Sequence, residues 1–365
     1  MVADKAEKQR RGVKAVAASK IVLESIGLRD RPESLIRELY AAAGPLHAEA
    51  VPGQPRQPLE QALAFARSLP GAYDGATIVA RDDAGRIVGY ADVAVQDMDG
   101  FRHVAQAGIG VLPGHRRAGI GRALLGGVLE VAGRLGRSLL MGDTRETVPA
   151  GEAFARRIGA GLGQVMIENR LDLRAVDRDL LRSWVEAGPA RAPGYHLEFV
   201  RGGTPDGLVP GVLAMLELVI NTAPRDDLQV GDRAVTPERL REEERAAATA
   251  GLERWACYAV DDASGDFVGL TDIVVNSAAP ERVYVGNTAV EPAHRGRALG
   301  KWLKGAMTQK ALAELPAARW LVTSNAASNE AMLSINRQLG FQASAEVKTW
   351  QVSIERARAY LSGQT

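Results

Sequence analysis

The amino-acid sequence predicts a mixed α/β (α+β) protein that contains two copies of one structural unit. Its 365 residues exceed the roughly 100–200 residues that a single domain usually takes. A loop segment occurs twice, at an offset of 179 residues. Each copy of the loop follows a predicted pair of strands and precedes a predicted helix, so both copies are expected to adopt the same fold.

The repeated loop is the clearest sign of duplication. Residues 111–121 (VLPGHRRAGIG) align with residues 290–300 (VEPAHRGRALG), with identical Val, Pro, His, Arg and final Gly. Upstream, residues 76–95 and 255–275 each hold two apolar stretches around a turn that contains Asp and Gly. This pattern predicts a β-hairpin in each copy. Asp92 in the first hairpin matches Asp272 in the second.

The segments after the two loops also match. Residues 121–135 carry apolar side chains at the spacing of a helix, as do Trp302, Leu303 and Met307 in the second copy. A strand (138–141 or 320–323), a second helix that ends at Gly159 or Gly340, and a final strand follow. We therefore expect a basic flexible tail (1–19), an N-terminal domain (20–173), a linker helix and turn (174–194) and a C-terminal domain (195–355).

Composition limits the function. A net charge of +1 argues against a nucleic-acid partner. Cys257 is the one cysteine, which excludes an intrachain disulfide and a Cys-rich metal site, and its apolar surroundings predict a buried strand. The sequence shows no secretory signal and no apolar stretch long enough for a membrane span, so we expect a cytoplasmic protein without a membrane partner. The oligomeric state is not indicated.

The chemistry of the loop points to a diphosphate. In Arg116-x-x-Gly119-x-Gly121, the glycines let the backbone approach a ligand, and successive N–H groups converge at the start of a helix. Arg117 and Arg122 add positive charge. The loop lacks the Gly-Lys-Ser/Thr of a Walker A motif, and it lacks the third glycine of a dinucleotide-binding fingerprint.

This loop resembles the Q/R-x-x-G-x-G/A signature of the GNAT superfamily of N-acetyltransferases, and the resemblance extends over about residues 20–355. In the second copy, Asn325, Asn329 and the Leu-Gly-Phe ending at Phe341 resemble a further GNAT segment. Mycothiol synthase is one tandem relative in this superfamily. The resemblance implies two tandem acyl-CoA N-acyltransferase domains, each with a mostly antiparallel sheet that splays to admit acetyl-CoA as co-substrate, and no metal.

The resemblance also implies which residues contact acetyl-CoA. Backbone groups of the two loops would hold the pyrophosphate, and Val111 and Val290 would offer backbone groups to the pantetheine or thioester. Two asparagines would form hydrogen bonds near the thiol end of CoA, although Asn329 is equally suited to cap a helix. The implied cofactor-binding set is Val111, Arg116, Arg117, Ala118, Gly119, Ile120, Gly121, Arg122, Val290, Arg295, Gly296, Arg297, Ala298, Leu299, Gly300, Lys301, Asn325 and Asn329.

The two copies depart from the GNAT pattern in different places. Ala298 replaces the first loop glycine of the second copy, whereas the first copy lacks the paired asparagines. Many GNAT proteins protonate the departing CoA thiolate with a tyrosine, but Ala155 and Asn336 stand at that position. The general acid is therefore unassigned.

Candidates for the general base are Tyr284 and Asp272 in the second copy, and His103 and Asp92 in the first. The expected function is acetyl transfer to a primary amine of a small molecule, with the second copy favoured as catalytic because it keeps Asn325 and Asn329. Two alternatives remain: a non-catalytic acyl-CoA sensor or scaffold, and a protein-lysine acetyltransferase, for which the acidic run at 242–244 is a hint.

Overall fold

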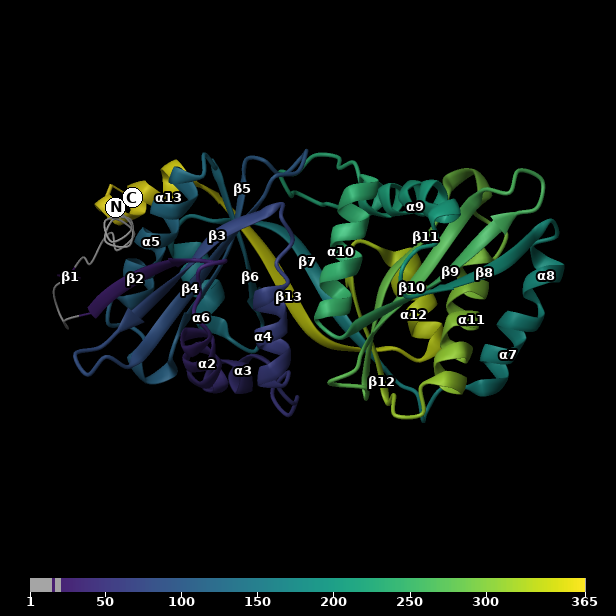
Figure 1. Cartoon of the computed structure of the whole chain (residues 1–365), viewed down its shortest axis with the longest axis horizontal. Helices are drawn as coiled ribbons and strands as arrows, with labels where there is room; N and C mark the ends of the chain where they lie inside the picture. The colour runs from purple at the N-terminus through teal and green to yellow at the C-terminus, as the bar shows by residue number, and fades with distance from the viewer. Residues whose placement is uncertain (1–14, 17–20, 365) are drawn as a thin grey trace, which may run out of the picture. The chain divides into compact units, whose positions relative to one another are not determined.

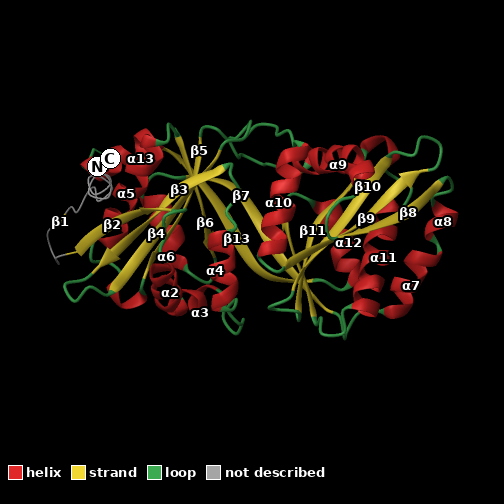
Figure 2. Ribbon diagram, in the orientation of Figure 1, coloured by secondary structure: helices red, strands yellow, loops and turns green. Residues whose placement is uncertain are grey.

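The computed structural model describes residues 15, 16 and 21–364. Two compact units make up the chain (Figure 1). Unit 1 comprises the chain up to Gly163, then Asp227–Val230 and Lys348–Thr365, whereas unit 2 comprises Gln164–Asp226 and Gly231–Val347. Each unit combines a sheet with helices (Figure 2).

The strands of the chain are β1 (Ala15–Val16), β2 (Ile21–Gly27), β3 (Tyr73–Arg81), β4 (Ile87–Gln96), β5 (Val104–Val111), β6 (Leu139–Arg145), β7 (Gly161–Asp172), β8 (Tyr195–Arg201), β9 (Leu252–Asp261), β10 (Phe267–Asn276), β11 (Arg282–Val290), β12 (Trp320–Ala326) and β13 (Gln342–Ser353). The helices are α2 (Glu33–Ala42), α3 (Gly44–Ala50), α4 (Leu59–Arg67), α5 (Ile120–Arg134), α6 (Pro149–Arg157), α7 (Arg178–Glu186), α8 (Gly188–Arg191), α9 (Val209–Thr222), α10 (Pro237–Thr249), α11 (Leu299–Glu314), α12 (Glu330–Leu339) and α13 (Ile354–Ser362).

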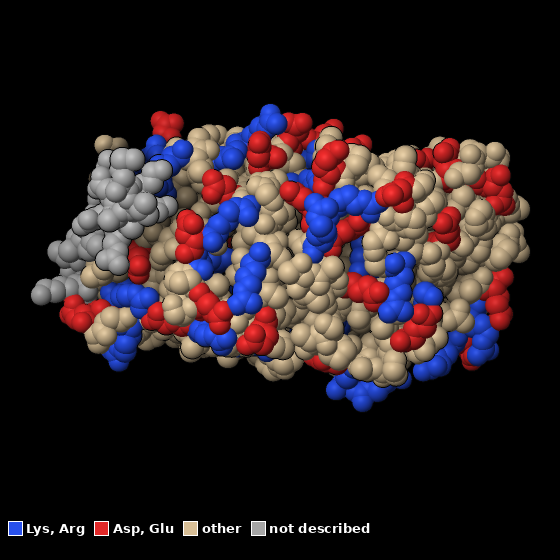
Figure 3. All heavy atoms as spheres, in the orientation of Figure 1, with Lys and Arg blue, Asp and Glu red and all other residues tan. Residues whose placement is uncertain are grey.

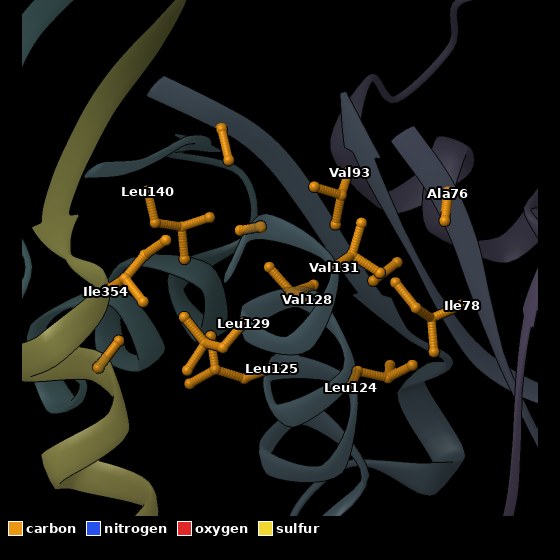
Figure 4. Packing of buried hydrophobic residues seen from close by; sticks show 14 of the residues in the cluster. Ala76, Ile78, Val93, Leu124, Leu125, Val128, Leu129, Val131, Leu140 and Ile354 are labelled. Atoms are coloured by element: carbon orange, nitrogen blue, oxygen red, sulfur yellow. The ribbon is translucent and has the colours of Figure 1, made fainter. Parts of the chain in front are cut away.

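The sheet of unit 1 has the order β1-β2-β3-β4-β5-β6-β13. Neighbours from β1 to β5 are antiparallel, and β5 and β6 are parallel. Helix α5 covers one face, where its buried leucines and valines pack on β3, β4 and β6 (Figure 4). Helix α2 packs on the opposite face through Leu35, against Val79 and Ile87. Apolar residues at the helical spacing of α5 thus form the centre of this core, as the sequence predicts.

Unit 2 repeats this layout with the sheet order β13-β7-β12-β11-β10-β9-β8. Helices α7 and α11 pack on one face through Trp184, Trp302 and Leu303. Helices α9 and α10 pack on the other face, where Met215 and Leu240 meet Tyr258. The two predicted hairpins are β3–β4 and β9–β10.

The boundaries of the units differ from those expected from the sequence. Strand β13 begins in unit 2 and, from Lys348 onward, belongs to unit 1. Its second half is tied there by side-chain bonds from Lys348 to Glu152 and from Trp350 to Thr144. The first unit is therefore completed by the C-terminal end of the chain instead of closing near residue 173.

The expected linker at 174–194 forms α7 and α8, and its Leu181 and Trp184 are buried in the core of unit 2. It is thus an integral part of that unit. The basic tail expected at 1–19 lies outside the described residues, apart from Ala15 and Val16. Cys257 is buried in β9, as predicted, and burial raises the pKa of its thiol to about 12.

Charged side chains of both signs are interspersed on the face drawn in Figure 3, which agrees with the small net charge. Within the described part of the chain, none of the helices has the length and apolar character needed to cross a membrane. Nor do these residues include a group of three or more His, Cys, Asp or Glu side chains arranged to hold a metal ion.

Candidate functional site

In each sheet the pairing of two parallel strands stops before the strands end. In unit 1, pairing joins Val104–Gln106 of β5 to Leu139–Met141 of β6, and both strands then run on, to Val111 and Arg145. In unit 2, pairing ends at Tyr284 with Val322, and β11 continues to Val290. Beyond the last pair the two strands are no longer hydrogen-bonded to each other, and we call this unpaired stretch the opening of the unit. The first strand of each opening leads directly into the repeated loop.

The two loops share one backbone conformation although their sequences differ. In unit 1, Arg117 and Gly119 have φ angles of 66° and 81°, and α5 begins at the next residue. In unit 2, Gly296 and Ala298 have φ angles of 81° and 61°, and α11 begins at Leu299. Each loop thus places two residues in the left-handed region. This alternation turns successive N–H groups to one side, as an anion-binding nest requires.

The first arginine of each loop, Arg116 or Arg295, forms a hydrogen bond with the end of the strand that precedes the loop. Arg116 donates from Nε to the Val111 carbonyl at 3.1 Å, and Arg295 donates in the same way to Val290 at 2.9 Å. Arg116 also pairs with Glu49 of α3, at 2.8 and 2.5 Å, and this hydrogen bond lowers the pKa of the Glu49 carboxyl. These arginines therefore fix the exit of β5 and β11, and the Val carbonyls are already engaged.

The remaining basic side chains near the loops are held at the surface. Arg122 donates to the Leu361 carbonyl, Arg297 donates to the Ala293 carbonyl at 2.9 Å, and Lys301 lies 5.2 Å from the Trp184 ring. Ile120 and Leu299 point into the two cores, so only their backbone groups face a ligand. Gly121 and Gly300 lie where an added Cβ would approach Phe154 and Ile335 at ordinary contact distances of 3.7 and 3.6 Å.

The comparisons with known proteins agree with this geometry. The profile of the acetyltransferase (GNAT) family matches residues 37–160 and 222–341, once in each half of the chain. The chain belongs to the GNAT acetyltransferase family. The tandem GNAT fold that the sequence predicts is therefore confirmed.

Solved structures extend the match to nearly the whole chain. The chain is similar to a tandem GNAT protein from the clavulanic acid biosynthesis pathway, with 27% identity, a TM-score of 0.75 and coverage of 91% of this chain and 98% of that one. It is also similar to a GCN5-related N-acetyltransferase from Sphaerobacter thermophilus, with 16% identity, a TM-score of 0.63 and coverage of 92% and 96%. No curated protein matches the chain.

In the second GNAT unit, the two asparagines expected near the thiol end both have structural partners. Asn329 caps α12 by accepting from the Met332 N–H at 3.3 Å. Asn325 accepts at 2.7 Å from Asn336, which stands where many GNAT proteins have their tyrosine and is almost fully buried. The Asn336 Oδ1 is buried without a hydrogen-bond partner among the described residues. The amide pair therefore stiffens one wall of the opening.

Asp272 is a structural carboxylate in the GNAT sheet of unit 2. Its Oδ2 lies 2.7 Å from both Nε and an Nη of Arg254, and its Oδ1 accepts from the Asn287 N–H at 2.6 Å. Pairing of β10 with β11 shifts by one residue between Thr271 and Ile273, and the carboxylate closes this bulge. With its side chain only 3% exposed, Asp272 is poorly placed to take a proton from a substrate.

Tyr284, the other expected base, lies at the point where the opening of unit 2 begins, and it is 40% exposed. In unit 1 the corresponding last paired residue is Gln106, which has no proton to exchange near neutral pH. His103 of unit 1 donates a ring N–H to the Gln229 carbonyl at 2.8 Å, which indicates a structural role.

Asp92 has a different environment from its counterpart Asp272. Its side chain is 49% exposed and accepts from the Thr77 hydroxyl at 2.5 Å. In register it stands opposite Gly108 of β5, just beyond the last pair of β5 with β6. Arg31, from the segment between β2 and α2, approaches it to 4.0 Å. Sequence reasoning missed Arg31 because no motif marks the region before residue 75.

Proposed function

We propose that the chain transfers an acetyl group from acetyl-CoA to a primary amine of a small molecule, and that unit 1 carries out the transfer. The exposed carboxylate of Asp92 at the start of the opening supports this choice most directly. The loop of the same unit keeps Gly119 and Gly121. In unit 2 the matching carboxylate, Asp272, forms an ion pair with Arg254. In this proposal unit 2 therefore binds CoA without catalysing the transfer.

In this proposal the loop N–H groups of unit 1 hold the pyrophosphate, and the opening between β5 and β6 holds the pantetheine. The amine nitrogen attacks the thioester carbonyl carbon, the C–N bond forms, and the C–S bond breaks with its electron pair leaving on sulfur. Asp92 accepts the proton that the nitrogen loses, and the thiolate takes a proton from water. Holding the two reactants in contact supplies much of the acceleration.

Measurement of free-thiol release from acetyl-CoA with a panel of small amines tests the proposal. Asp92→Asn is expected to lower kcat about 10²–10⁴-fold, the usual contribution of a positioned base. Tyr284→Phe removes the exposed base candidate of unit 2, and it is expected to leave kcat unchanged. The reverse result would move the reaction to unit 2.

Two outcomes of the same experiment favour other functions. Tight CoA binding without turnover on any acceptor would favour a non-catalytic acyl-CoA sensor. Turnover on lysine-containing peptides alone would favour a protein-lysine acetyltransferase. The acidic run at 242–244 suggested a groove for a lysine-containing acceptor. Two of its carboxylates already form ion pairs, because Glu243 pairs with Arg239 at 2.9 Å and Glu244 pairs with Arg241 at 2.8 Å.

A further inference from the structure

Unit 1 contains a ligand-sized cavity between the segment after β2 and the end of α4. Its volume is about 320 Å³, within the range of small-molecule sites. Three arginines and one glutamate line it together with apolar side chains; the residues that matter here are Arg29, Arg31, Glu33, Ile36, Arg67 and Leu69. The cavity therefore combines positive charge with an aliphatic wall.

Arg29 is a rigid cation on this wall. Its guanidinium donates to the carbonyl oxygens of Leu69, Pro70 and Tyr73 at 3.1, 2.6 and 2.9 Å. Carbonyl oxygens are neutral acceptors, so these bonds hold the side chain in place without cancelling its charge. Arg67 differs, because it pairs with Glu33 at 2.5 Å.

Arg31 joins the cavity to Asp92. It donates from Nε to the Leu28 carbonyl at 3.0 Å, and its side chain is 15% exposed. One of its terminal nitrogens lies 4.0 Å from Asp92 Oδ1 and 3.5 Å from the Thr77 hydroxyl. At 4.0 Å the two charges do not form a direct hydrogen bond. A cation and an anion thus stand side by side, and each has capacity for a further partner.

Unit 2 lacks this arrangement at the corresponding place. The segment after β8 carries Gly202 and Gly203. The nearby arginine, Arg241 of α10, is neutralised by Glu244 and Asp206. The matched carboxylate of unit 2 is paired as well. The open pair of opposite charges is therefore a feature of unit 1.

We propose that this cavity binds the head group of an α-amino acid, which is the acetyl acceptor. The substrate carboxylate pairs with Arg31 beside the fixed charge of Arg29, and the amine lies against Asp92. An aliphatic side chain extends along Ile36 and Leu69. This inference rests on the proposed function, because it names the substrate class of the same site.

The test compares apolar amino acids with analogues that lack the acid group. Leucine, valine and methionine are assayed with acetyl-CoA, each beside its carboxamide and its decarboxylated amine. We expect the free acids to show at least about 10-fold higher kcat/KM than either analogue, because a charged hydrogen bond is lost in the analogues. Arg31→Gln keeps a donor near the Leu28 carbonyl and is expected to reduce kcat/KM for the acids about 10–100-fold more than for the analogues, so that the preference for acids is lost.

Two control variants separate the loss of charge at position 31 from the general effect of removing an arginine. Arg86→Gln, which removes an exposed arginine paired with Asp82 at 2.7 Å in the β3–β4 turn, is expected to leave all substrates unaffected. Arg31→Lys retains the charge and is expected to recover part of the preference for acids. Retained unfolding temperatures of the three variants exclude loss of fold.

Calorimetric titration of the full chain with the same amino acids, without acetyl-CoA, separates this inference from the proposed function. Binding that is lost in Arg31→Gln supports the amino-acid site whatever the turnover. Transfer to amines of all kinds without preference for acids, together with no binding heat, overturns the inference while leaving acetyl transfer intact.

Discussion

Ala298 of unit 2 adopts the left-handed conformation that Gly119 adopts in unit 1, with φ angles of 61° and 81°. An L-residue in this region is disfavoured by roughly 1–2 kcal/mol relative to its ordinary conformations, whereas glycine is not. We therefore expect Ala298→Gly to stabilise unit 2 by about 0.5–1 kcal/mol, since the greater chain entropy of glycine in the unfolded state offsets part of the relief.

The mirror substitution Gly119→Ala is expected to destabilise unit 1 by about 1 kcal/mol. An added Cβ there meets nothing within 4 Å, so the effect comes from the backbone alone. Urea unfolding of both variants is the measurement. A loss of stability in Ala298→Gly would contradict the strain argument.

The buried ammonium of Lys304 makes the stability of unit 2 depend on pH. Leu125 stands at the matching position of unit 1. Lys304 is 4% exposed and lines a cavity of about 10 Å³ with Thr271 and Thr308, which is close to the room that one water needs. Burial lowers the pKa of Lys304 to about 8, although nearby Asp272 partly counteracts this.

Because the folded-state pKa lies below the unfolded value of about 10.4, the unfolded chain binds more protons between the two values. The stability of the wild type is therefore expected to rise with pH from about 8 to 10.4. Lys304→Leu should be more stable than the wild type at pH 7 by about 1–3 kcal/mol, and this advantage should shrink across that window. Chemical unfolding at pH 7, 8, 9 and 10 measures it, and a pH-independent difference would refute the buried-charge explanation.

Of the two matched aspartates, Asp272 is expected to contribute more to the free energy of unfolding, because it forms a buried ion pair with Arg254. Asp272→Asn removes the carboxylate and leaves a largely buried guanidinium without its counter-ion, which should cost about 3–5 kcal/mol. Asp92→Asn is the control at the half-exposed site and should cost about 0–1 kcal/mol. Equal losses in urea unfolding would argue against the structural role of Asp272.

Asn329 offers a direct comparison of a helix cap with a cofactor contact. Asn329→Ala should lower stability by about 1 kcal/mol through loss of the cap, whereas Asn329→Asp should preserve it. If the cap is the main role, the Kd for CoA changes less than about twofold in both variants. A large rise in Kd at unchanged stability would instead assign the residue to CoA.

Much of the fold was predictable because the duplication repeats the same local signals. The hairpins, the helix after each loop and the position of Cys257 follow from apolar periodicity and turn residues. The apolar periodicity of a strand does not, however, indicate which other strand it pairs with. The passage of β13 from one unit to the other therefore could not be inferred from the residues around Lys348.

The site was predictable in its loops but not in its side-chain partners. The left-handed pair formed by Gly296 and Ala298 needs an alanine in a conformation that sequence rules assign to glycine. The contact of Arg31 with Asp92 joins residues about 60 positions apart and follows from no spacing rule. Nor does spacing reveal that Arg254 neutralises Asp272, which decides how the two aspartates differ.

The sharing of β13 has a consequence for how the protein is made. A ribosome releases the N-terminal unit first, yet β6 of that unit gains its neighbour β13 only when residues 348–365 have been synthesised. While the second unit is translated, the first unit lacks β13, and β6 remains an edge strand with one side unpaired. A stop codon just before Lys348 would thus damage the half of the protein that is farthest from it in the gene.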